Sequence, residues 1–379
     1  MAIDKYRNSN AVFNTIHSLI PRKLDWYIIK KFLGAFFLSI ALIISIAIVF
    51  DVSEKLDDFM DPRFNIKFKE IVFDYYANFV PYFVNLFSPL FTFISVILFT
   101  SKMADNTEII SILASGISYR RLLWPYMLAA AFIATMTFFL SSEVIPPSNT
   151  KRIEFTERLR TRKRSTDVIN LQMKIEKDVV LTIRNYNKVS NTGFNASMER
   201  FDGKKLVSRL TAHVIKYDTL HHWKMHGCVI RDFDGLYEKM ERHTELDTIL
   251  NVEPEEFFIY AGMEEQMTNK QLVQFIDRQK SRGMGEVKSF EIEYAKRYAA
   301  PFAAFILTII GVSLSSRKVR GGMGANLGIG LLLSFVYIMF FTLSSTFAVS
   351  GMLSPTIAAW LPNIVFTFIA GYVYSKAQK

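Results

Sequence analysis

The sequence is poor in cysteine and lacks the motifs of nucleotide and peptide hydrolysis. Cys228 is the only cysteine among 379 residues, so no disulfide can form within the chain. We interpret it as a small packed residue. The G-x-x-x-x-G-K-[ST] loop of nucleotide hydrolases and the H-E-x-x-H motif of zinc proteases are both absent. The chain is therefore not expected to be an enzyme of either class.

Charge is missing from six long apolar runs, namely residues 32–50, 75–100, 122–140, 301–315, 325–349 and 357–374. Such runs, in a chain that is 50% hydrophobic and holds 34 Phe, predict an integral membrane protein with six spans. The first run exceeds a signal-peptide core and is followed by Asp51 rather than a small-residue cleavage site, so we interpret it as a retained span. Pro81 and Pro89 interrupt the second run and predict a kinked packing helix.

Because these runs hold no Asp, Glu, Lys, Arg or His, ion-coupled transport, proton relays and intramembrane hydrolysis all lack their usual side chains. The strongest polar groups within or beside them are amides, which are expected to join helices: Asn78, Asn85, Asn326 and Asn363. If the protein moves a substrate, a partner must supply the energy.

The net charge of +10 has a topological explanation. No nucleic-acid-reading motif accompanies the basic residues, so we exclude nucleic acid as a partner. The basic clusters flank the spans on one side, at residues 22–31, 102–121, 317–320 and the C-terminus, whereas one opposite loop, 51–69, is acidic and polar. The positive-inside rule then predicts that both termini are cytoplasmic and that residues 143–289 lie outside.

The outer region reads as a separate β domain. Apolar residues alternate with polar ones at Ile169–Ile175 and Val179–Ile183, and Asp202-Gly203 is a hairpin signal. An antiparallel sandwich or jelly roll suits many short strands. A capping box at Thr268–Gln271 then starts a helix that should end near Gly283. We predict spans 1–3 in residues 1–142, a β-jellyroll in 143–289 and spans 4–6 in 290–379.

One group of side chains has metal-ligand chemistry: His221, His222, His226 and Cys228. Trp223 and Met225 interleave with them, which is more typical of a strand or turn than of a metal site. We assign no metal to the chain.

The stretch Ser101–Arg121 joins the second and third spans on the cytoplasmic side. Asp105 or Asn106 can cap a short helix, with Glu108 in its first turn, where a carboxylate favours the helix dipole. We expect Ile109, Ile110, Ile112 and Leu113 on one side, and Gly116, after Ala114-Ser115, as a left-handed cap. Such a helix suits docking into a groove on a cytoplasmic partner, or lying against the bilayer.

Several motifs together resemble the LptF/LptG permease family of the lipopolysaccharide exporter. Leu24-Asp25-Trp26-Tyr27 is similar to that family's entry to the first span, and Asn106–Gly116 resembles its coupling helix, E-x-x-x-x-x-A-S-G. Glu143–Pro147 is similar to the outer end of its third span, and Gly311–Ser315 with Arg320–Gly324 to the turn after its fourth. The plan of three spans, one domain and three spans fits as well.

The resemblance implies the transmembrane permease of an ABC transporter in the bacterial inner membrane. Family members pair as LptF with LptG, act on a dimeric cytoplasmic LptB ATPase that binds the ATP and Mg, and extract lipopolysaccharide. Periplasmic β-jellyrolls, with LptC and LptA, pass the lipid on. No cofactor is expected in this chain. Coupling to the ATPase would fall to Glu108, Ile109, Ile110, Ile112, Leu113, Ser115 and Gly116.

The resemblance also implies lipid contacts. Leu181 and Ile183 would belong to the inner face of a lipid-conducting β domain. G-type family members carry phosphate-binding lysines near the outer end of the first span, where this chain has Lys55 among Glu54, Asp57 and Asp58. Lys55 is therefore either a lipid contact or a partner for nearby carboxylates. The motifs do not separate F-like from G-like chains.

A second function fits the same architecture. A membrane-anchored scaffold or sensor would use its outer β domain to bind a ligand or protein, and it would not need the Ser101–Arg121 helix to contact an ATPase. Copurification distinguishes the two, because only a permease should bring down a nucleotide-binding subunit.

Overall fold

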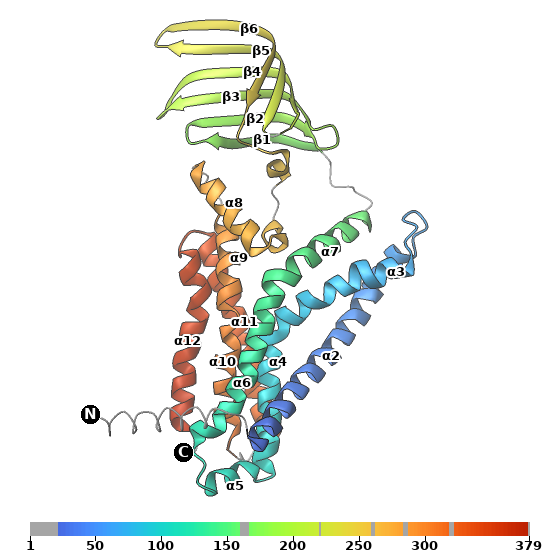
Figure 1. Cartoon of the computed structure of the whole chain (residues 1–379), viewed down its shortest axis with the longest axis vertical. Coiled ribbons are helices and arrows are strands. Elements are labelled where there is room, and N and C mark those ends of the chain that lie inside the picture. The colour runs from blue at the N-terminus through green and yellow to red at the C-terminus, as the bar shows by residue number, and fades with distance from the viewer. Residues whose placement is uncertain are drawn as a thin grey trace, which may run out of the picture.

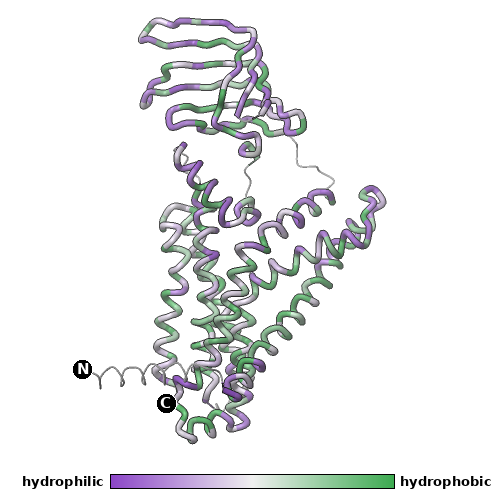
Figure 2. The backbone as a smooth tube through the Cα atoms, in the orientation of Figure 1, coloured by the Kyte–Doolittle hydropathy of each residue, from purple (hydrophilic) through white to green (hydrophobic). Residues whose placement is uncertain are grey.

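The computed structural model describes residues 22–159, 167–219, 221–258, 262–282, 287–317 and 322–377. A bundle of long helices carries a β domain at one end and the short helix α5 (Glu108–Ala114) at the other (Figure 1). Within the described residues, five helices are long and apolar enough to cross a membrane, or six when one bent pair counts as a span. The long helices are apolar through most of their length, whereas the strands mix polar and apolar residues (Figure 2). This confirms a membrane helix bundle with an inserted β domain.

The first span is longer than expected. Helix α2 (Lys23–Met60) has 38 residues, which corresponds to about 57 Å, whereas a bilayer core is about 30 Å thick. The prediction that residues 51–69 form a polar loop was wrong for its first half. Asp51 and Lys55 pair one turn apart, and no proline interrupts the chain before Pro62, so the helix continues beyond the apolar run.

The second and third spans also extend toward the β domain. The second consists of α3 (Phe68–Glu70), the π-helical η1 (Ile71–Tyr76) and α4 (Ala77–Asp105), and α4 continues through both of its prolines. The third consists of α6 (Tyr119–Phe139), the π-helical η2 (Leu140–Val144) and α7 (Ile145–Leu159). Residues 145–159, placed in the β region from sequence, are therefore helical.

The fourth span is bent by 47° between α9 (Lys288–Ala299) and α10 (Phe302–Ser315). Pro301 lies in the bend, and the amide of Ala303 binds the carbonyl of Ala300, which frees the carbonyl of Ala299. Asn363 Nδ2 donates to that carbonyl at 2.7 Å. Asn363 lies on α12 (Pro355–Lys376), so a side-chain amide satisfies the backbone of a neighbouring helix.

Helix α4 lies at the centre of the bundle. One apolar cluster joins it to α2 and α6, and another joins it to α10, α12 and α11 (Gly322–Val349). Polar side chains connect the same helices: Asn326 of α11 donates to Ser101 of α4 at 3.2 Å, and Tyr337 of α11 donates to Asn363 at 2.8 Å. The prediction that Asn326 and Asn363 join helices is confirmed.

The β domain is one curved antiparallel sheet in which consecutive strands are neighbours. Its strands are β1 (Asp167–Glu176), β2 (Val179–Asn187), β3 (Thr192–Asp202), β4 (Lys205–Tyr217), β5 (His222–Asp234) and β6 (Tyr237–Ile249). The connectivity is that of a meander, whereas a Greek-key jelly roll would need crossing connections. The predicted hairpin is confirmed: Asp202 pairs with Lys205, and Gly203 has a φ of 62°.

One face of the sheet encloses an apolar core around the buried side chain of Trp223, whose indole N–H donates to the carbonyl of Val252 at 3.2 Å. After β6 the chain passes through η3 (Pro254–Phe258), η4 (Met263–Gln266) and α8 (Asn269–Ser281) and reaches α9. The capping box of Thr268 and Gln271 at the start of α8 is confirmed. The helix ends two residues before Gly283, as expected.

Candidate functional site

The coupling segment, residues 101–121, contains the end of α4, the helix α5 and the start of α6. The expected cap at Asp105 or Asn106 was wrong. Asn106 ends α4, since its backbone N–H donates to the carbonyl of Lys102, and α5 begins after Thr107, which has a φ of 62° and makes no side-chain cap bond. A sharp reversal between two helices places a left-handed residue at this position. At the other end, Gly116 has a φ of 86°, as predicted.

The apolar residues of α5 do not share one side. Ile109 is 1% exposed and packs in the bundle core, with Ile112 and Leu113 half-buried against the same cluster, whereas Ile110 is 45% exposed. A helix turns 100° per residue, so positions i, i+3 and i+4 face together and i+1 points away. The surface that α5 leaves open therefore consists of Ile110 and its small neighbours Ser111, Ala114, Ser115 and Gly116.

Glu108 begins α5 and is half-buried. Its Oε1 accepts from Asn106 Nδ2 at 3.2 Å, and its Oε2 lies 3.4 Å from the hydroxyl of Tyr27 in the first turns of α2. No cation is placed against this carboxylate in the described residues. The group is held in position while remaining accessible to a basic side chain from outside.

An ion pair that the sequence did not reveal joins the start of α2 to the start of α6. Asp25, 2% exposed in the first turn of α2, accepts from both terminal nitrogens of Arg121, at 2.7 and 2.5 Å. The backbone N–H of Arg22 donates to the same carboxylate at 2.7 Å. Asp25 stood within a recognised motif and Arg121 at the end of the Ser101–Arg121 stretch, but 96 positions separate them, and no local signal pairs residues so far apart.

Lys55 is occupied within the chain. Its ammonium group binds the carboxylate of Asp51 and the hydroxyl of Tyr75, and Tyr76 donates to the other oxygen of Asp51 at 3.0 Å. The carboxylate partner is thus Asp51, one turn before Lys55 on α2, rather than Glu54, Asp57 or Asp58. Aromatic rings of α2, η1 and α7 surround this group. A lysine neutralised in this way is a weak anion ligand.

Leu181 and Ile183 lie on the enclosed face of the sheet, and both are 0% exposed. They pack with side chains of the other strands and of η3 in one cluster. Beyond this cluster, β6 is exposed along most of its length, and Tyr237, Met240 and Ile249 leave large apolar areas open. The free β6 side of the sheet is the open part of the domain.

A cavity of about 310 Å³ lies where the bundle meets the segment below the β domain, and its lining includes Tyr82, Asn149, Glu265, Lys296, Tyr337 and Phe341. Asn149 is fully buried, and its Oδ1 has no hydrogen-bond partner within the described structure. Its Nδ2 lies 3.4 Å from Glu265. Burial and the nearby Glu293 and Glu264 raise the pKa of Glu265, against a smaller opposing effect of Arg152 and Lys296.

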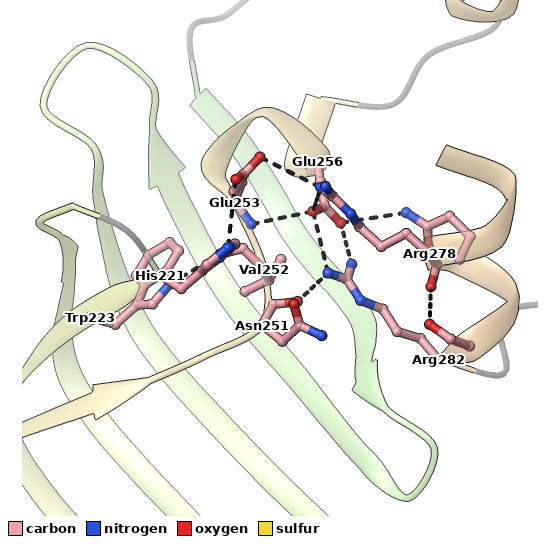
Figure 3. Close-up of polar contacts among 10 residues, drawn as sticks. His221, Trp223, Asn251, Val252, Glu253, Glu256, Arg278 and Arg282 are labelled. Atoms are coloured by element: carbon pink, nitrogen blue, oxygen red, sulfur yellow. Dashed lines mark hydrogen bonds and ion pairs between the residues drawn. The ribbon is translucent and has the colours of Figure 1, made fainter. Parts of the chain in front are cut away.

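The β domain is attached to the helices through a buried cluster of charges (Figure 3). Glu256 of η3 accepts from Arg282, which directly follows α8, and from Arg278 at 3.1 Å. Arg278 also lies 3.6 Å from Glu253, and Arg282 donates to the carbonyl of Asn251. Sequence reasoning missed this joint because its members are scattered over different elements.

Helix α8 is bound in turn to α9. Lys280 pairs with Glu291 at 2.5 Å, and Leu272, Ile276 and Phe290 form an apolar cluster between the two helices. Arg297 of α9, which is buried, donates to the carbonyl of Met267 at 2.7 Å. Side-chain contacts therefore connect the β domain to α8 and α8 to the fourth span.

The described residues contain no group of three or more His, Cys, Asp or Glu placed to hold a metal ion. Of the residues considered above as ligands, His221 precedes β5, and His222 and His226 lie exposed on that strand. Trp223 and Met225 between these two histidines are buried, and so is Cys228. Burial raises the pKa of the Cys228 thiol. The candidate site therefore has three parts: the open surface of α5, the cavity lined by Tyr82 and Asn149, and the apolar face of the β sheet.

Comparison with known proteins gives one family. None of the curated proteins searched matches the chain. The family model of the lipopolysaccharide export system permease LptF/LptG matches residues 26–376. That range begins within the first turn of α2 and ends at the last residue of α12, so it includes all the spans, the coupling segment and the β domain. The chain belongs to the LptF/LptG family of lipopolysaccharide export permeases.

Proposed function

We propose that the chain is the transmembrane permease subunit of an ABC transporter that extracts lipopolysaccharide from the bacterial inner membrane. A separate cytoplasmic ATPase dimer of the LptB type binds ATP and Mg and docks on α5. The observation that carries this proposal is the open surface of α5 around Ile110, with Glu108 beside it, at the end of the bundle opposite the β domain. A short helix with an anchored apolar side and an open side suits a groove on a partner.

A second LptF/LptG-type chain would complete the permease. Large apolar side chains are exposed along both α2 and α11: Leu38, Leu42, Ile46, Leu331, Leu332 and Phe335. Lipid or another permease chain must cover them in a membrane. A paired chain would also enclose the space between the two permeases, which suits the acyl chains of the substrate.

The β domain would receive the lipid and pass it to LptC/LptA-type periplasmic proteins. Its free edges are β1 and β6, and the exposed β6 offers unpaired backbone groups for strand addition by a neighbouring sheet. The enclosed face with Leu181 and Ile183 would continue into the neighbour's apolar face. Lys55 stays a weak candidate for lipid contact, because Asp51 already neutralises it.

The orientation follows from the charge bias: α5 and both termini in the cytoplasm and the β domain in the periplasm. We expect single cysteines, in a Cys228→Ala background, to react according to side. In intact spheroplasts an impermeant thiol reagent should label Lys205→Cys in the β domain and should spare Arg120→Cys at the start of α6. Both positions are exposed, so accessibility is matched. Labelling of position 120 with protection of 205 would reverse the topology.

Copurification tests the function. The tagged chain, extracted from native membranes, should bring down a nucleotide-binding subunit, a second permease chain and periplasmic β proteins. The eluted complex should hydrolyse ATP, although the chain alone should not. A scaffold or sensor would copurify without a nucleotide-binding subunit, and that result would favour the alternative function.

A further inference from the structure

The first turns of α2 contact the coupling segment at two points. The hydroxyl of Tyr27 lies 3.4 Å from Glu108, the first residue of α5. Beyond the end of α5, Asp25 holds Arg121 through two hydrogen bonds. One turn of the first span is therefore bound to the segment at the start of α5 and again after its end.

The two contacts differ in strength. The tyrosine contact is long and exposed, so it contributes little. The Asp25–Arg121 pair is bidentate, and Asp25 is almost wholly buried with a third bond from the Arg22 backbone. Two parallel hydrogen bonds between a planar guanidinium and a carboxylate fix the relative orientation of α2 and α6 as well as the distance between them. Loss of Arg121 would leave a buried carboxylate without compensation.

Helix α2 can carry a displacement over a long distance. It is continuous from Lys23 to Met60 and has no proline. Its start is packed in the core with α4 and α6, where Ile28, Phe32 and Phe36 are buried. In Figure 1, α2 runs away from α10, α11 and α12 toward the end that carries the β domain. A tilt at its start would therefore move its far end, near Lys55, by a larger distance.

We propose that Asp25 is a positioning residue that makes the coupling segment and the first span move as one body. A displacement of α5 by the ATPase then reaches the outer end of α2 through Arg121. This inference rests on the proposed function for the role of α5. The rigid connection itself is a property of the chain alone and can be measured without a partner.

Spin labels measure the connection. Ser111→Cys on α5 and Lys30→Cys on α2 are both exposed and report the distance between the two elements in the Cys228→Ala background. In the otherwise unchanged chain, reconstituted alone, the distance distribution should be narrow. Asp25→Asn and Arg121→Lys should each broaden it, while Arg120→Gln, at the exposed neighbouring position, should not. A distribution that Asp25→Asn and Arg121→Lys leave narrow would overturn the proposal.

Transport supplies a readout that a purely structural ion pair would not change. In proteoliposomes with the complete complex, Asp25→Asn should retain ATPase capture and ATP hydrolysis, while lipid released per ATP should fall about tenfold. The exchanged pair, Asp25→Arg with Arg121→Asp, should recover part of that loss. If Asp25→Asn does not insert, Arg121→Lys, which keeps the charge but loses the fork, takes its place. Unchanged lipid release per ATP would refute the role, whereas failure of the unchanged chain to capture an ATPase would refute the proposed function and leave the distance result standing.

Discussion

Glu108→Lys should remove the ATPase from the complex. Glu108 begins α5, and it is half-buried beside Asn106. As a dipole partner alone the carboxylate would contribute about 0.3–1 kcal/mol, which assembly would tolerate. As one member of a partly buried ion pair with the ATPase, its reversal would cost several kcal/mol, since two cations would then face each other. We expect at least about a tenfold fall in captured ATPase per permease.

The matched control is Asp105→Lys, an exposed acidic residue at the end of α4 that lies three residues earlier. It makes the same change of charge close to the helix without altering the first turn of α5. Membrane insertion and the protease resistance of the β domain should stay normal for both variants. A basic-to-acidic change in the ATPase groove should restore part of the capture by Glu108→Lys. Normal capture and normal export by Glu108→Lys would reduce Glu108 to a helix-start residue.

Leu181→Asp should unfold or open the β domain while the helix bundle persists. Leu181 is 0% exposed, and its strand neighbours in the register are Met173 and Met198. The change removes a buried apolar side chain and places a carboxylate among apolar groups without a partner, so we expect a loss of about 3–5 kcal/mol in domain stability. Limited proteolysis in membranes should then cut within residues 167–258, while the spans remain protected.

The control for Leu181→Asp is Gln172→Asp on the neighbouring strand. Gln172 is exposed, so the same carboxylate there stays in water. It should leave the protease pattern unchanged. Photocrosslinkers at positions 181 and 183 should also capture lipid in an ATP-dependent way, and those at 172 and 174 should not. Equal protease resistance of Leu181→Asp and Gln172→Asp would show that the assigned face does not form the core.

The spans and the β domain were predictable from sequence because each depends on a local regularity. An uncharged apolar run marks a span, and alternation marks a half-buried strand, as at residues 179–183. Helix ends were less predictable: α2 continues to Met60 because a polar helix can extend beyond the membrane when nothing breaks it. The apolar pattern identifies the part that lies in lipid, not the part that is helical.

The candidate site was less predictable, because tertiary contacts decide which side chains stay open. All the isoleucines of α5 look alike in the sequence, yet Ile109 is buried in the bundle and Ile110 is not. The pairing of Asp25 with Arg121 and of Glu256 with Arg282 needs the positions of elements that the sequence places far apart. The sequence shows that these residues are charged and could form ion pairs. A single sequence does not show which distant residue pairs with each of them.

The Glu256–Arg282 joint determines where the β domain can be cut from the protein. A fragment that stops at Phe258, the end of η3, would retain Glu256 and lose both of the arginines that neutralise it. Its carboxylate would then lack both of its cations, and the edge of the core beside Val252 would be uncovered. A soluble fragment should therefore extend through Arg282 and carry α8 with it. As a folding unit the β domain is therefore expected to comprise its sheet, η3, η4 and α8.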